Sequence, residues 1–536
     1  MMNTMKINRE AWVVFLFSVI LCYSNIWGYP ITILDEAKNA EAAREMLLGN
    51  HFIPFFNDVL RTDKPPLHYF FMQLGYLIFG VNELGARFFS ALFGAGFLTY
   101  FFLFLKKFST RNIARMTTVF LLSSFFWVQE FHLAVPDPYF IVLLCSSWLF
   151  FFEFYSANQI KKVKSQKRHF IFLFFAFVGL ATLAKGPLAI GLTGLIILLF
   201  FLFKKELNWR IFRKYHIIYG GLLVLIISTP WYLWIHIQTN GAFTDGFFYH
   251  HNIKRFKEEI GGHGGIFLLT WVYVLLGLFP FGAFIPQGIW HAWKFKNKSD
   301  LVYFSLIISV VVILFFSFSS TKLPNYTLPA IPFLAILIAS YFEEAFHFET
   351  FKKWWNYFSL TLISLISLAI PIAVFILFKH EFIIGYQVIL SLILSTITVV
   401  GLYFIWKYFL NSNLQNFILS IAFVWISIGF MIFYFVYPNL AKIEPVVQSS
   451  QLIENNEVVV FDNYDPAFNF NYQRTFKIFD NEDKLISFAQ QNPQILVLTK
   501  KRSIEHTSKI EENFEIVFNQ PSIFENYRTI ILKLKQ

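Results

Sequence analysis

The chain has 536 residues, of which 56% are hydrophobic and only 14% are charged, and it contains 72 phenylalanines. This composition excludes an ordinary soluble enzyme, because apolar runs long enough to cross a bilayer, about 20 residues each, recur along the chain. The net charge of +11 does not indicate a nucleic-acid partner, since most Lys and Arg residues lie in short loops between apolar runs. Cys22 and Cys145 both lie in apolar runs, and they indicate neither a disulfide framework nor a metal site.

Thirteen membrane-spanning helices are predicted in the first 440 residues. The apolar runs that define them lie near 11–28, 84–105, 113–131, 138–155, 169–184, 186–203, 216–236, 266–290, 301–319, 325–342, 356–378, 384–406 and 415–437. The first run lacks a clear small-residue cleavage site, so it is interpreted as a retained signal-anchor. The apolar piece at 65–80 is shorter and opens with two prolines, which predicts an interfacial or re-entrant helix.

The basic clusters predict the orientation in the membrane. They comprise Lys106, Lys107, Arg111 and Arg115, then "KKVKSQKR" (161–168), "KKELNWRIFRK" (204–214), "KFKNK" (294–298), and Lys352 with Lys353. With the N-terminus in the cytoplasm, the thirteen spans place every cluster on the cytoplasmic side, as the positive-inside rule requires. The opposite side then holds a first loop at 31–83, with amphipathic helices, and the C-terminus.

From about residue 440 the sequence changes character. "EVVVFDN", "FNFNYQRTFKIFD", "QILVLTKK", "FEIVFN" and "TIILKLK" are short alternating or β-branched runs, and helical patterns such as "NEDKLISFAQQ" separate them. A domain of roughly 85 to 95 residues is within the usual size range. The predicted fold is therefore an all-α polytopic membrane domain, residues 1–440, followed by a small α/β domain outside the cytoplasm, residues 441–536.

Asp35 and Glu36 open a polar stretch directly after the first predicted span. Small and apolar residues at three-to-four spacing in "DEAKNAEAAREMLL" predict an amphipathic helix on the membrane surface. Asp35 has two interpretations: an N-cap that accepts N–H bonds from the first helical turn, or a general base at the lipid–water boundary. Both can hold only if one carboxylate oxygen stays available for substrate.

Asp63 and Lys64 precede two prolines in "DKPP". Prolines disfavour a helical residue before them and can start the next helix, so Lys64 is expected just ahead of a rigid helix start. A cation beside helix N–H groups suits a phosphate. The alternative is a snorkelling lysine next to a turn.

Asp137 in "VPDP" and Lys185 in "LAKGP" are ionisable residues at predicted span ends. Asp137 fits a plain turn, which is the default interpretation of an Asp-Pro step. Lys185 interrupts an apolar stretch and is a candidate for a functional site, with snorkelling as the alternative.

Two further stretches carry candidates. His251 and Arg255 in "FFYHHNIKRF" would share one helical face, or belong to a solvated basic loop; metal binding by His250 and His251 is the weaker interpretation, since adjacent histidines diverge on a helix. Lys322 and Tyr326, four residues apart in "TKLPNYTLPAIP", lie at a predicted span entrance, where Tyr also fits an aromatic belt.

The order of these motifs resembles the GT-C superfamily of polyprenyl-phosphate-sugar transferases, in particular the branch with the lipid A aminoarabinose transferases and the protein O-mannosyltransferases. The resemblance covers about residues 10 to 340: an Asp-Glu helix, "KPP", "PD", "AKGP", "H-N-x-x-R-F" and "K-L-P-x-Y-x-L-P-A-x-P". Relatives usually carry Glu before "KPP", where this chain has Asp63, and this leaves the role of that carboxylate open.

The resemblance implies that a sugar leaves a polyprenyl phosphate and joins an acceptor with inversion. By position, Asp35 is implied as the base or acceptor-orienting carboxylate and Asp137 as a second carboxylate. Substrate-binding roles are implied for Glu36, Asp63, Lys64, Lys185, His251, Arg255, Lys322 and Tyr326. The activated lipid supplies the energy, and the chain has no G-x-x-x-x-G-K-[ST] nucleotide loop.

The expected function is transfer of one sugar from undecaprenyl phosphate to an envelope acceptor such as lipid A. It is expected on the periplasmic side of a bacterial inner membrane. One alternative is O-glycosylation of exported proteins; another, from a different class, is a secondary transporter or lipid flippase. The expected partners are the carrier-linked donor, a lipid or protein acceptor and membrane lipids, without nucleic acid. No metal ligand is assigned, and a divalent cation beside the carboxylates stays open.

Overall fold

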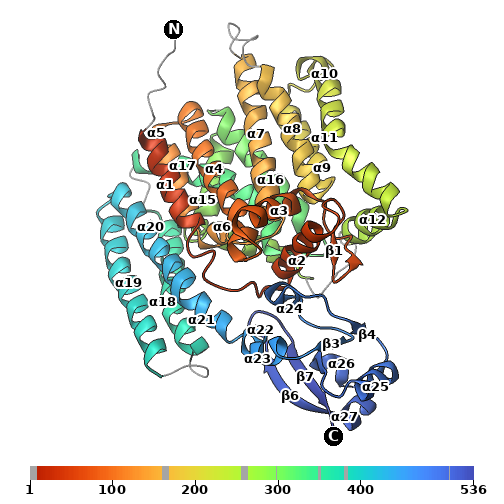
Figure 1. The fold of residues 1–536 in the computed structure, drawn as a ribbon. Helices are drawn as coiled ribbons and strands as arrows, with labels where there is room; N and C mark the ends of the chain where they lie inside the picture. Colours follow the sequence, from red (N-terminus) through yellow and green to blue (C-terminus); the bar gives the residue numbers. More distant parts are fainter. Residues whose placement is uncertain are drawn as a thin grey trace. The chain divides into compact units, whose positions relative to one another are not determined.

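The computed structural model describes residues 9–159, 168–254, 264–296, 298–347, 352–378, 384–505 and 507–535 (Figure 1). The chain forms two compact units, which are described separately. The helical unit comprises Met1–Ser24, Thr62–His68 and Phe89–Met431, and the mixed unit comprises Asn25–Arg61, Tyr69–Phe88 and Ile432–Gln536. Two segments of the predicted first loop therefore fold with the C-terminal residues. The predicted boundary between 440 and 441 stays a prediction.

Nine helices in the described residues are long and apolar enough to cross a membrane, or ten if one bent pair counts as a single span. They are Glu83–Phe108, Asp137–Gln159, Arg168–Lys185, Ile217–Gln238, Asp300–Ser317, Pro324–Ala345, Trp354–Phe378, Val388–Leu410 and Leu414–Lys442. The predicted polytopic helical fold with a small strand-containing C-terminal part is confirmed. The count of thirteen spans stays a prediction, because four of the predicted spans are short, broken or bent helices.

The helical unit is built mainly from α-helices, labelled in Figure 1. In chain order they are α1 (Arg9–Cys22), α5 (Arg111–Ser123), α6 (Phe125–Glu130), α7 (Asp137–Gln159), α8 (Arg168–Lys185), α9 (Leu188–Phe203), α10 (Arg210–Lys214), α11 (Ile217–Gln238), α12 (Ala242–Thr244), η1 (Asp245–Lys254), α14 (Phe267–Gly277), η2 (Phe281–Phe284), α15 (Ile285–Lys294), α16 (Asp300–Ser317), η3 (Pro324–Ala330), α17 (Ile331–His347), α18 (Trp354–Phe378), α19 (Ile384–Leu410) and α20 (Leu414–Met431). Two helices contribute to both units: α3 (Leu67–Phe79) and α4 (Glu83–Phe108). The short helix expected at 65–80 is present as α3.

One predicted span is a bent pair. The sequence at 266–290 predicts a single helix, but α14 ends at Gly277, and the following helical segment, Phe281–Lys294, departs at 119°. Pro280 has no N–H group with which to continue the helical ladder. Gly282 allows the chain to fold back closely, since a Cβ there would lie 2.1 Å from the carbonyl oxygen of Leu275.

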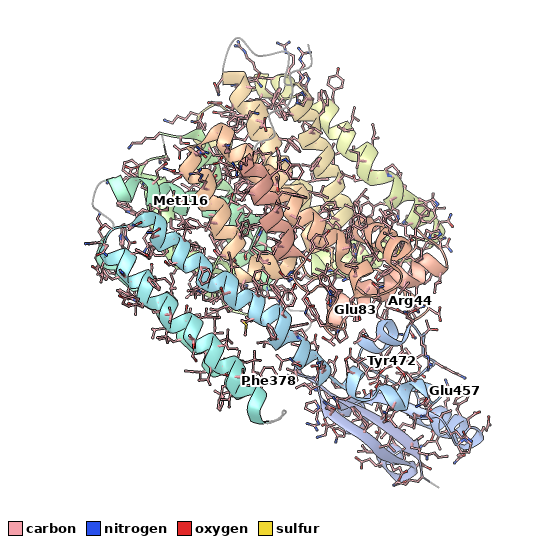
Figure 2. The ribbon with its side chains drawn as sticks, turned by 60° about the vertical axis from the view of Figure 1, so that its left-hand side comes forward. Arg44, Glu83, Met116, Phe378, Glu457 and Tyr472 are labelled. Carbon is pink, nitrogen blue, oxygen red and sulfur yellow. The ribbon has the colours of Figure 1, made fainter. Side chains whose placement is uncertain are left out.

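Aromatic rings fill the core of the helical unit. The ring of Phe151 on α7 lies 5.7 Å from those of Tyr215 and Phe304 and 6.3 Å from that of Phe200, distances typical of favourable ring contacts. Helices α7 and α8 pack side by side, and α17 packs against α5, α15 and α16. Figure 2 adds the side chains and labels Met116 on α5. Phenylalanines thus supply much of the packing between helices.

The mixed unit contains a five-stranded sheet in the order β4-β3-β5-β7-β6. Its strands are β3 (Val458–Phe461), β4 (Ile478–Phe479), β5 (Leu496–Lys500), β6 (Phe514–Pro521) and β7 (Arg528–Leu534). Strand β3 pairs in parallel with β4 and β5, whereas β7 pairs antiparallel with β5 and β6. One layer of the core packs Val459, Val497 and Leu532 of the sheet with Leu485 and Ala489 of α25 (Glu482–Gln491).

The remaining elements of the mixed unit are short. They are α2 (Leu34–Leu48), β1 (Phe55–Phe56), β2 (Val59–Leu60), η5 (Ile432–Val436), α21 (Tyr437–Lys442), α22 (Pro445–Gln448), α23 (Ser450–Glu454), α24 (Ala467–Tyr472), α26 (Lys501–Ile504) and α27 (Ser508–Asn513). The prediction of a strand for the run "FNFNYQRTFKIFD" is wrong for its first residues, which belong to α24, whereas Ile478 and Phe479 near its end form β4. The carboxylate of Asp465 accepts a hydrogen bond from the N–H of Ala467 (2.9 Å), and this interaction starts a helix where alternation predicts a strand.

Candidate functional site

Asp137 and Lys185 form an ion pair inside the helical unit. Asp137 is the first residue of α7 and Lys185 is the last residue of α8. These helices are consecutive and pack side by side, so the start of one meets the end of the other. The carboxylate and the ammonium are in direct contact, with 3% and 13% of their side chains exposed. A pair this well buried is costly to break from one side.

Local sequence explains why both charges lie at helix ends. Asp137 lies between two prolines, which start α7, and a carboxylate in the first helical turn is stabilised by the helix dipole. Lys185 is favoured at the last position of α8 because the C-terminal end of a helix dipole is negative and stabilises a cation. Gly186 follows with φ +101°, a left-handed conformation that favours glycine, and its N–H donates to the carbonyl of Thr182 (2.8 Å).

Tyr326 completes a group that we name the Asp137–Lys185–Tyr326 cluster. The Nζ of Lys185 lies 4.9 Å from the centre of the Tyr326 ring and 5.5 Å from that of Phe140. Tyr326 lies in η3, where its ring is 5.0 Å from that of Phe316. Aromatic faces and a carboxylate thus hold the ammonium in place at the end of the helices. The structure brings three of the sequence-predicted residues together here, and their roles stay predictions.

Of the other predicted residues of the helical unit, Asp63, Lys64 and Lys322 lie in loops before helices. Asp63 and Lys64 are half-buried in the segment that ends where α3 begins at Leu67, directly after the prolines. Lys322 is buried and its Nζ donates to the carbonyl of Ser319. His251 lies within η1, and Arg255 lies outside the described residues.

Asp35 lies in the first turn of α2, in the mixed unit. The N-cap interpretation of Asp35 is wrong, because Ile33 occupies the N-cap position and Asp35 already has a helical position. Its side chain is 49% exposed, and its Oδ1 lies 3.8 Å from the guanidinium of the buried Arg61. A half-exposed carboxylate beside a cation is suited to bind or orient a substrate group.

Glu36, the next residue, is placed very differently. Its two carboxylate oxygens accept hydrogen bonds of 2.7 and 3.0 Å from Arg87, and both side chains are fully buried. Arg87 also donates to the carbonyls of Ile26 and Tyr29. This arrangement satisfies the pair internally and favours a structural role for Glu36. Its substrate-binding role stays a prediction.

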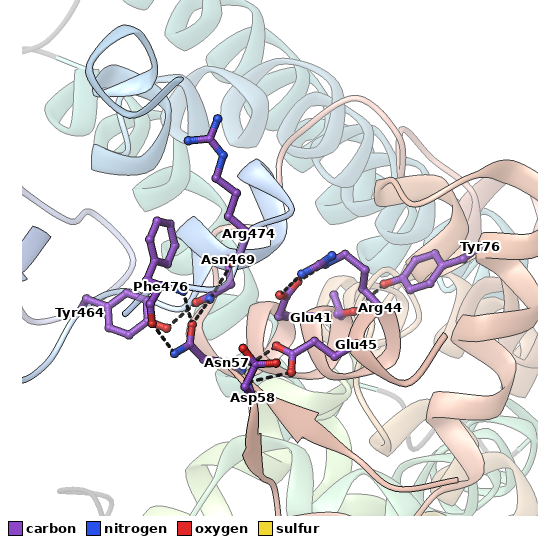
Figure 3. Close-up of polar contacts among 11 residues, drawn as sticks. Glu41, Arg44, Glu45, Asn57, Asp58, Tyr76, Tyr464, Asn469, Arg474 and Phe476 are labelled. Atoms are coloured by element: carbon purple, nitrogen blue, oxygen red, sulfur yellow. Dashed lines mark hydrogen bonds and ion pairs between the residues drawn. The ribbon is translucent and has the colours of Figure 1, made fainter. Parts of the chain in front are cut away.

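Helix α2 is buried on more than its apolar face. The sequence predicts an amphipathic helix with its charged residues exposed. In the structure, Glu41 and Arg44 are instead buried and paired with each other at 2.6 Å. Figure 3 shows this pair and the contact of Tyr76 with the helix; its hydroxyl donates to the Ala40 carbonyl (2.9 Å). The charges therefore hold α2 inside the mixed unit. A position on the membrane surface stays a prediction.

A polar network ties the β1–β2 hairpin to the C-terminal residues of the mixed unit (Figure 3). Asn57 donates to the carbonyl of Phe476 (2.8 Å), and its Oδ1 accepts from the Phe476 N–H (2.6 Å) and from the Asn469 side chain (2.9 Å). Glu45 accepts hydrogen bonds from the N–H groups of Asn57 and Asp58. Burial raises the pKa of Glu45 to about 7, although these two N–H groups oppose the shift.

Sequence reasoning missed Arg61 and Arg87. Arg61 lies within the polar stretch of the first loop, and this position is the sequence feature that could have marked it as a site residue. Arg87 lies four residues into α4 and 51 residues from Glu36, so no local pattern pairs the two. Within the described residues, no group of three or more His, Cys, Asp or Glu side chains is placed to hold a metal ion.

Comparison with known proteins identifies the fold. Residues 63–234 match the family described as dolichyl-phosphate-mannose-protein mannosyltransferase. The structure matches the crystal structure of ArnT from Cupriavidus metallidurans bound to undecaprenyl phosphate with a TM-score of 0.75 and 19% identity, over 97% of each chain. The structural match shows the fold, and together with the family match it supports the resemblance to the GT-C superfamily.

Two sequence relatives are described as undecaprenyl phosphate-alpha-4-amino-4-deoxy-L-arabinose arabinosyl transferase, the second of them with the number 2 added. The Shewanella sediminis protein is 29% identical over 64% of this chain, and a Proteus mirabilis protein is 30% identical over 57% of it. The alignments span 62% and 54% of the lengths of these relatives. The archaeal oligosaccharyltransferase AglB from Archaeoglobus fulgidus shares the fold more distantly, with a TM-score of 0.52, 12% identity and coverage of 92% of this chain and 69% of its own. The predicted GT-C resemblance is confirmed.

Proposed function

We propose that this chain is an inverting glycosyltransferase that moves a sugar from undecaprenyl phosphate to an envelope acceptor such as lipid A. The Asp137–Lys185–Tyr326 cluster is the observation that carries the proposal. Its buried carboxylate, its ammonium and its tyrosine come from three separate sequence motifs, and they meet at one end of the helices. The relatives named for undecaprenyl phosphate, and the similar fold of ArnT bound to undecaprenyl phosphate, support the choice of donor.

The proposed reaction is a single displacement at the anomeric carbon. The acceptor hydroxyl attacks this carbon, Asp35 takes the proton, and the bond from the anomeric carbon to the phosphate oxygen breaks. The donor phosphodiester becomes a phosphate monoester, so negative charge grows on oxygen in the transition state. Lysine and arginine side chains in a partly dry site stabilise such a charge more strongly than water does.

The predicted residues other than Glu36, whose carboxylate binds Arg87, keep their proposed roles in this scheme. Lys64, Arg255 and Tyr326 bind the carrier phosphate, and Lys322 is a further candidate. Asp137 and Lys185 support the site as carboxylate and charge partner, and His251 orients them. Asp63 contacts the sugar, or a divalent cation where one takes part.

We place the reaction on the periplasmic side of the bacterial inner membrane. The basic residues near the ends of α4, α9 and α15 support this orientation through the positive-inside rule. Asp137, Lys185 and Tyr326 lie at helix ends remote in sequence from these clusters. A cysteine introduced near Tyr326 would then react with a membrane-impermeant thiol reagent in intact spheroplasts.

A second acceptor class has its own support. The match of residues 63–234 to a protein mannosyltransferase family favours Ser or Thr of exported proteins as the alternative acceptor. A transporter or flippase would be expected to carry charges near mid-span, whereas the charges of the Asp137–Lys185–Tyr326 cluster lie at helix ends.

Paired variants test the proposal. Lys185→Ala and Asp137→Asn are expected to lower sugar transfer in membranes supplied with carrier-linked sugar by about 100-fold or more, the typical effect of losing a transition-state charge contact. The matched control is a second Lys–Asp–Tyr group in the helical unit, in which Lys204 contacts Asp300 and lies 5.8 Å from the Tyr303 ring. Lys204→Ala and Asp300→Asn should leave transfer within a few-fold of the wild type. Equal transfer in both sets, at equal protein levels, would overturn the assignment of the cluster.

A further inference from the structure

A cavity of about 530 Å³ lies in the helical unit, away from the Asp137–Lys185–Tyr326 cluster. Its apolar wall includes Ile113, Leu301 and Ile336, and its polar residues are Thr110, His291, Lys298, Ser340, Glu343 and Glu344. A volume of this size accommodates a small molecule or a lipid headgroup with part of its chains.

The cavity and Tyr326 lie at opposite ends of one candidate span, Pro324–Ala345. Tyr326 is near its start, and Glu343 and Glu344 are near its end. A helix of this length covers about 30 Å, the thickness of the hydrocarbon core. The cavity is therefore at the other membrane boundary, next to the basic residues that end α4 and α15.

The charges around the cavity favour a cation. Glu343 accepts a hydrogen bond from the Thr110 hydroxyl (2.5 Å). Glu344 contacts the Nε2 of His291 (2.8 Å) and the Nζ of Lys298 (3.5 Å). The lining thus carries two carboxylates and one ammonium, that of Lys298, whose side chain is 66% exposed, while Lys294 acts on His291 from outside the lining. The surplus negative charge is available for a bound ammonium group.

Two buried polar atoms in the lining are without a partner. The Oγ of Ser340 and the Nδ1 of His291 make no hydrogen bond to any part of the chain that the structure describes, although only 7% and 6% of these residues are exposed. Buried polar atoms are nearly always satisfied, so this pair indicates a ligand with hydrogen-bonding groups. A metal ion does not fit, since no three potential ligand side chains are grouped among the described residues.

We propose that this cavity binds the ammonium headgroup of an ethanolamine phospholipid. The three N–H donors of the ammonium meet Glu343, Glu344 and the Ser340 hydroxyl. The phosphate reaches the exposed Lys298 at the mouth, and the first part of an acyl chain lies on the apolar wall. The mixture of an apolar wall and a polar rim at a membrane boundary distinguishes a lipid from a soluble amine.

Native mass spectrometry of the full chain in detergent tests this proposal. The protein is titrated with dioleoyl-phosphatidylethanolamine, -phosphatidylcholine and -phosphatidylglycerol. The ethanolamine lipid is expected to bind at least 10-fold more tightly than the other two, because the choline headgroup has no N–H donor and the glycerol headgroup has no positive charge. Glu343→Gln should remove this preference, and Glu206→Gln, a carboxylate that does not line the cavity, should keep it.

The variant Ser340→Ala tests whether weaker lipid binding could result from misfolding instead of the loss of a direct contact. The Ser340 hydroxyl makes no hydrogen bond within the described residues, so the variant should keep the thermal stability of the wild type and still bind the ethanolamine lipid several-fold more weakly. Equal binding of the three lipids, or a preference unchanged in Glu343→Gln, would overturn the proposal. Ethanolamine or O-phosphoethanolamine that displaces the lipid at equal concentration would overturn the assignment to a lipid.

Discussion

Asp35 and Glu36 are adjacent carboxylates with opposite surroundings. Asp35 is half-exposed beside Arg61, whereas Glu36 is fully buried and bonded through both oxygens to Arg87. Successive residues of a helix point about 100° apart. The first turn of α2 therefore directs the Asp35 carboxylate toward solvent and the Glu36 carboxylate into the protein. We infer that only Asp35 is available for a proton transfer.

Asp35→Asn should therefore separate activity from stability. Loss of a general base lowers the rate by about 10²- to 10⁴-fold, while the exposed contact with Arg61 contributes at most about 1 kcal/mol. Sugar transfer and thermal unfolding of the purified variant check both expectations. A fully active variant would contradict the role of Asp35, and Asp58→Asn serves as a control on a neighbouring exposed carboxylate.

The Asp137–Lys185 pair allows structure and chemistry to be separated by a double substitution. Lys185→Met alone leaves a buried carboxylate without its ammonium, which costs about 3–5 kcal/mol. Adding Asp137→Asn removes that charge, so the double variant should recover most of the stability and none of the activity. Thermal unfolding and transfer assays measure the two effects. Recovery of activity together with stability would assign the pair a purely structural role.

At the scale of elements, buried ion pairs hold α2 in the mixed unit. Arg87→Met is expected to destabilise the unit by about 3–5 kcal/mol, because Glu36 loses both of its hydrogen bonds inside the protein. Arg111→Met is the control: it removes a guanidinium that is 62% exposed from its contact with Glu10, where exposed pairs contribute at most about 1 kcal/mol. Similar midpoints for both variants in thermal unfolding would contradict a stabilising role for the buried pair.

The start of α24 carries a pH-sensitive carboxyl. Burial raises the pKa of Asp465 to about 6, against the opposing effects of the Ala467 N–H, Tyr527 and Lys500. In the unfolded chain an aspartate has a pKa of about 3.9, so the native state keeps the Asp465 proton to higher pH. The stability that this protonated carboxyl contributes is therefore lost as pH rises from about 4 to about 6.

Asp465→Asn should remove this dependence. The stability of the wild type relative to the variant is expected to fall between pH 4 and pH 6, as measured by thermal unfolding of the full chain in detergent. Asp483→Asn, at a side chain that is 68% exposed, should follow the wild-type profile. Parallel profiles for the wild type and Asp465→Asn would contradict the shift.

The elements that sequence predicts correctly are those that local patterns determine. Apolar runs, the "KPP" helix start and the β-branched strands β3, β5 and β7 all depend on neighbouring residues. The errors arise where tertiary contacts decide. The "FNFNY" run alternates like a strand, yet the Asp465 side chain starts a helix there. The break after Gly277 needs a close approach of Gly282 to Leu275 that no periodicity reveals.

For the candidate site, sequence order predicts which residues matter but not their contacts. Asp137, Lys185 and Tyr326 are far apart in the chain, and they meet because the start of α7, the end of α8 and η3 lie together. Arg61 and Arg87 escape detection because an arginine in a loop or at a helix start has many ordinary roles. Burial, which sequence does not give directly, distinguishes them.

At the scale of the whole molecule, the chain combines a polytopic helical unit with a small mixed unit that includes two segments of the first loop. The proposed activity requires the donor to be a sugar on a polyprenyl phosphate and the acceptor to be an envelope lipid or protein. No soluble nucleotide is required, because the carrier phosphate is itself the leaving group.

The most direct test supplies the purified protein, in vesicles, with undecaprenyl phosphate that carries a mass-labelled sugar, together with lipid A. Mass spectrometry of both lipids follows the label. The account predicts that lipid A gains one sugar, that free undecaprenyl phosphate appears in equal amount, and that Asp35→Asn does neither. A donor that keeps its sugar in the presence of lipid A and of exported-protein acceptors alike would contradict it.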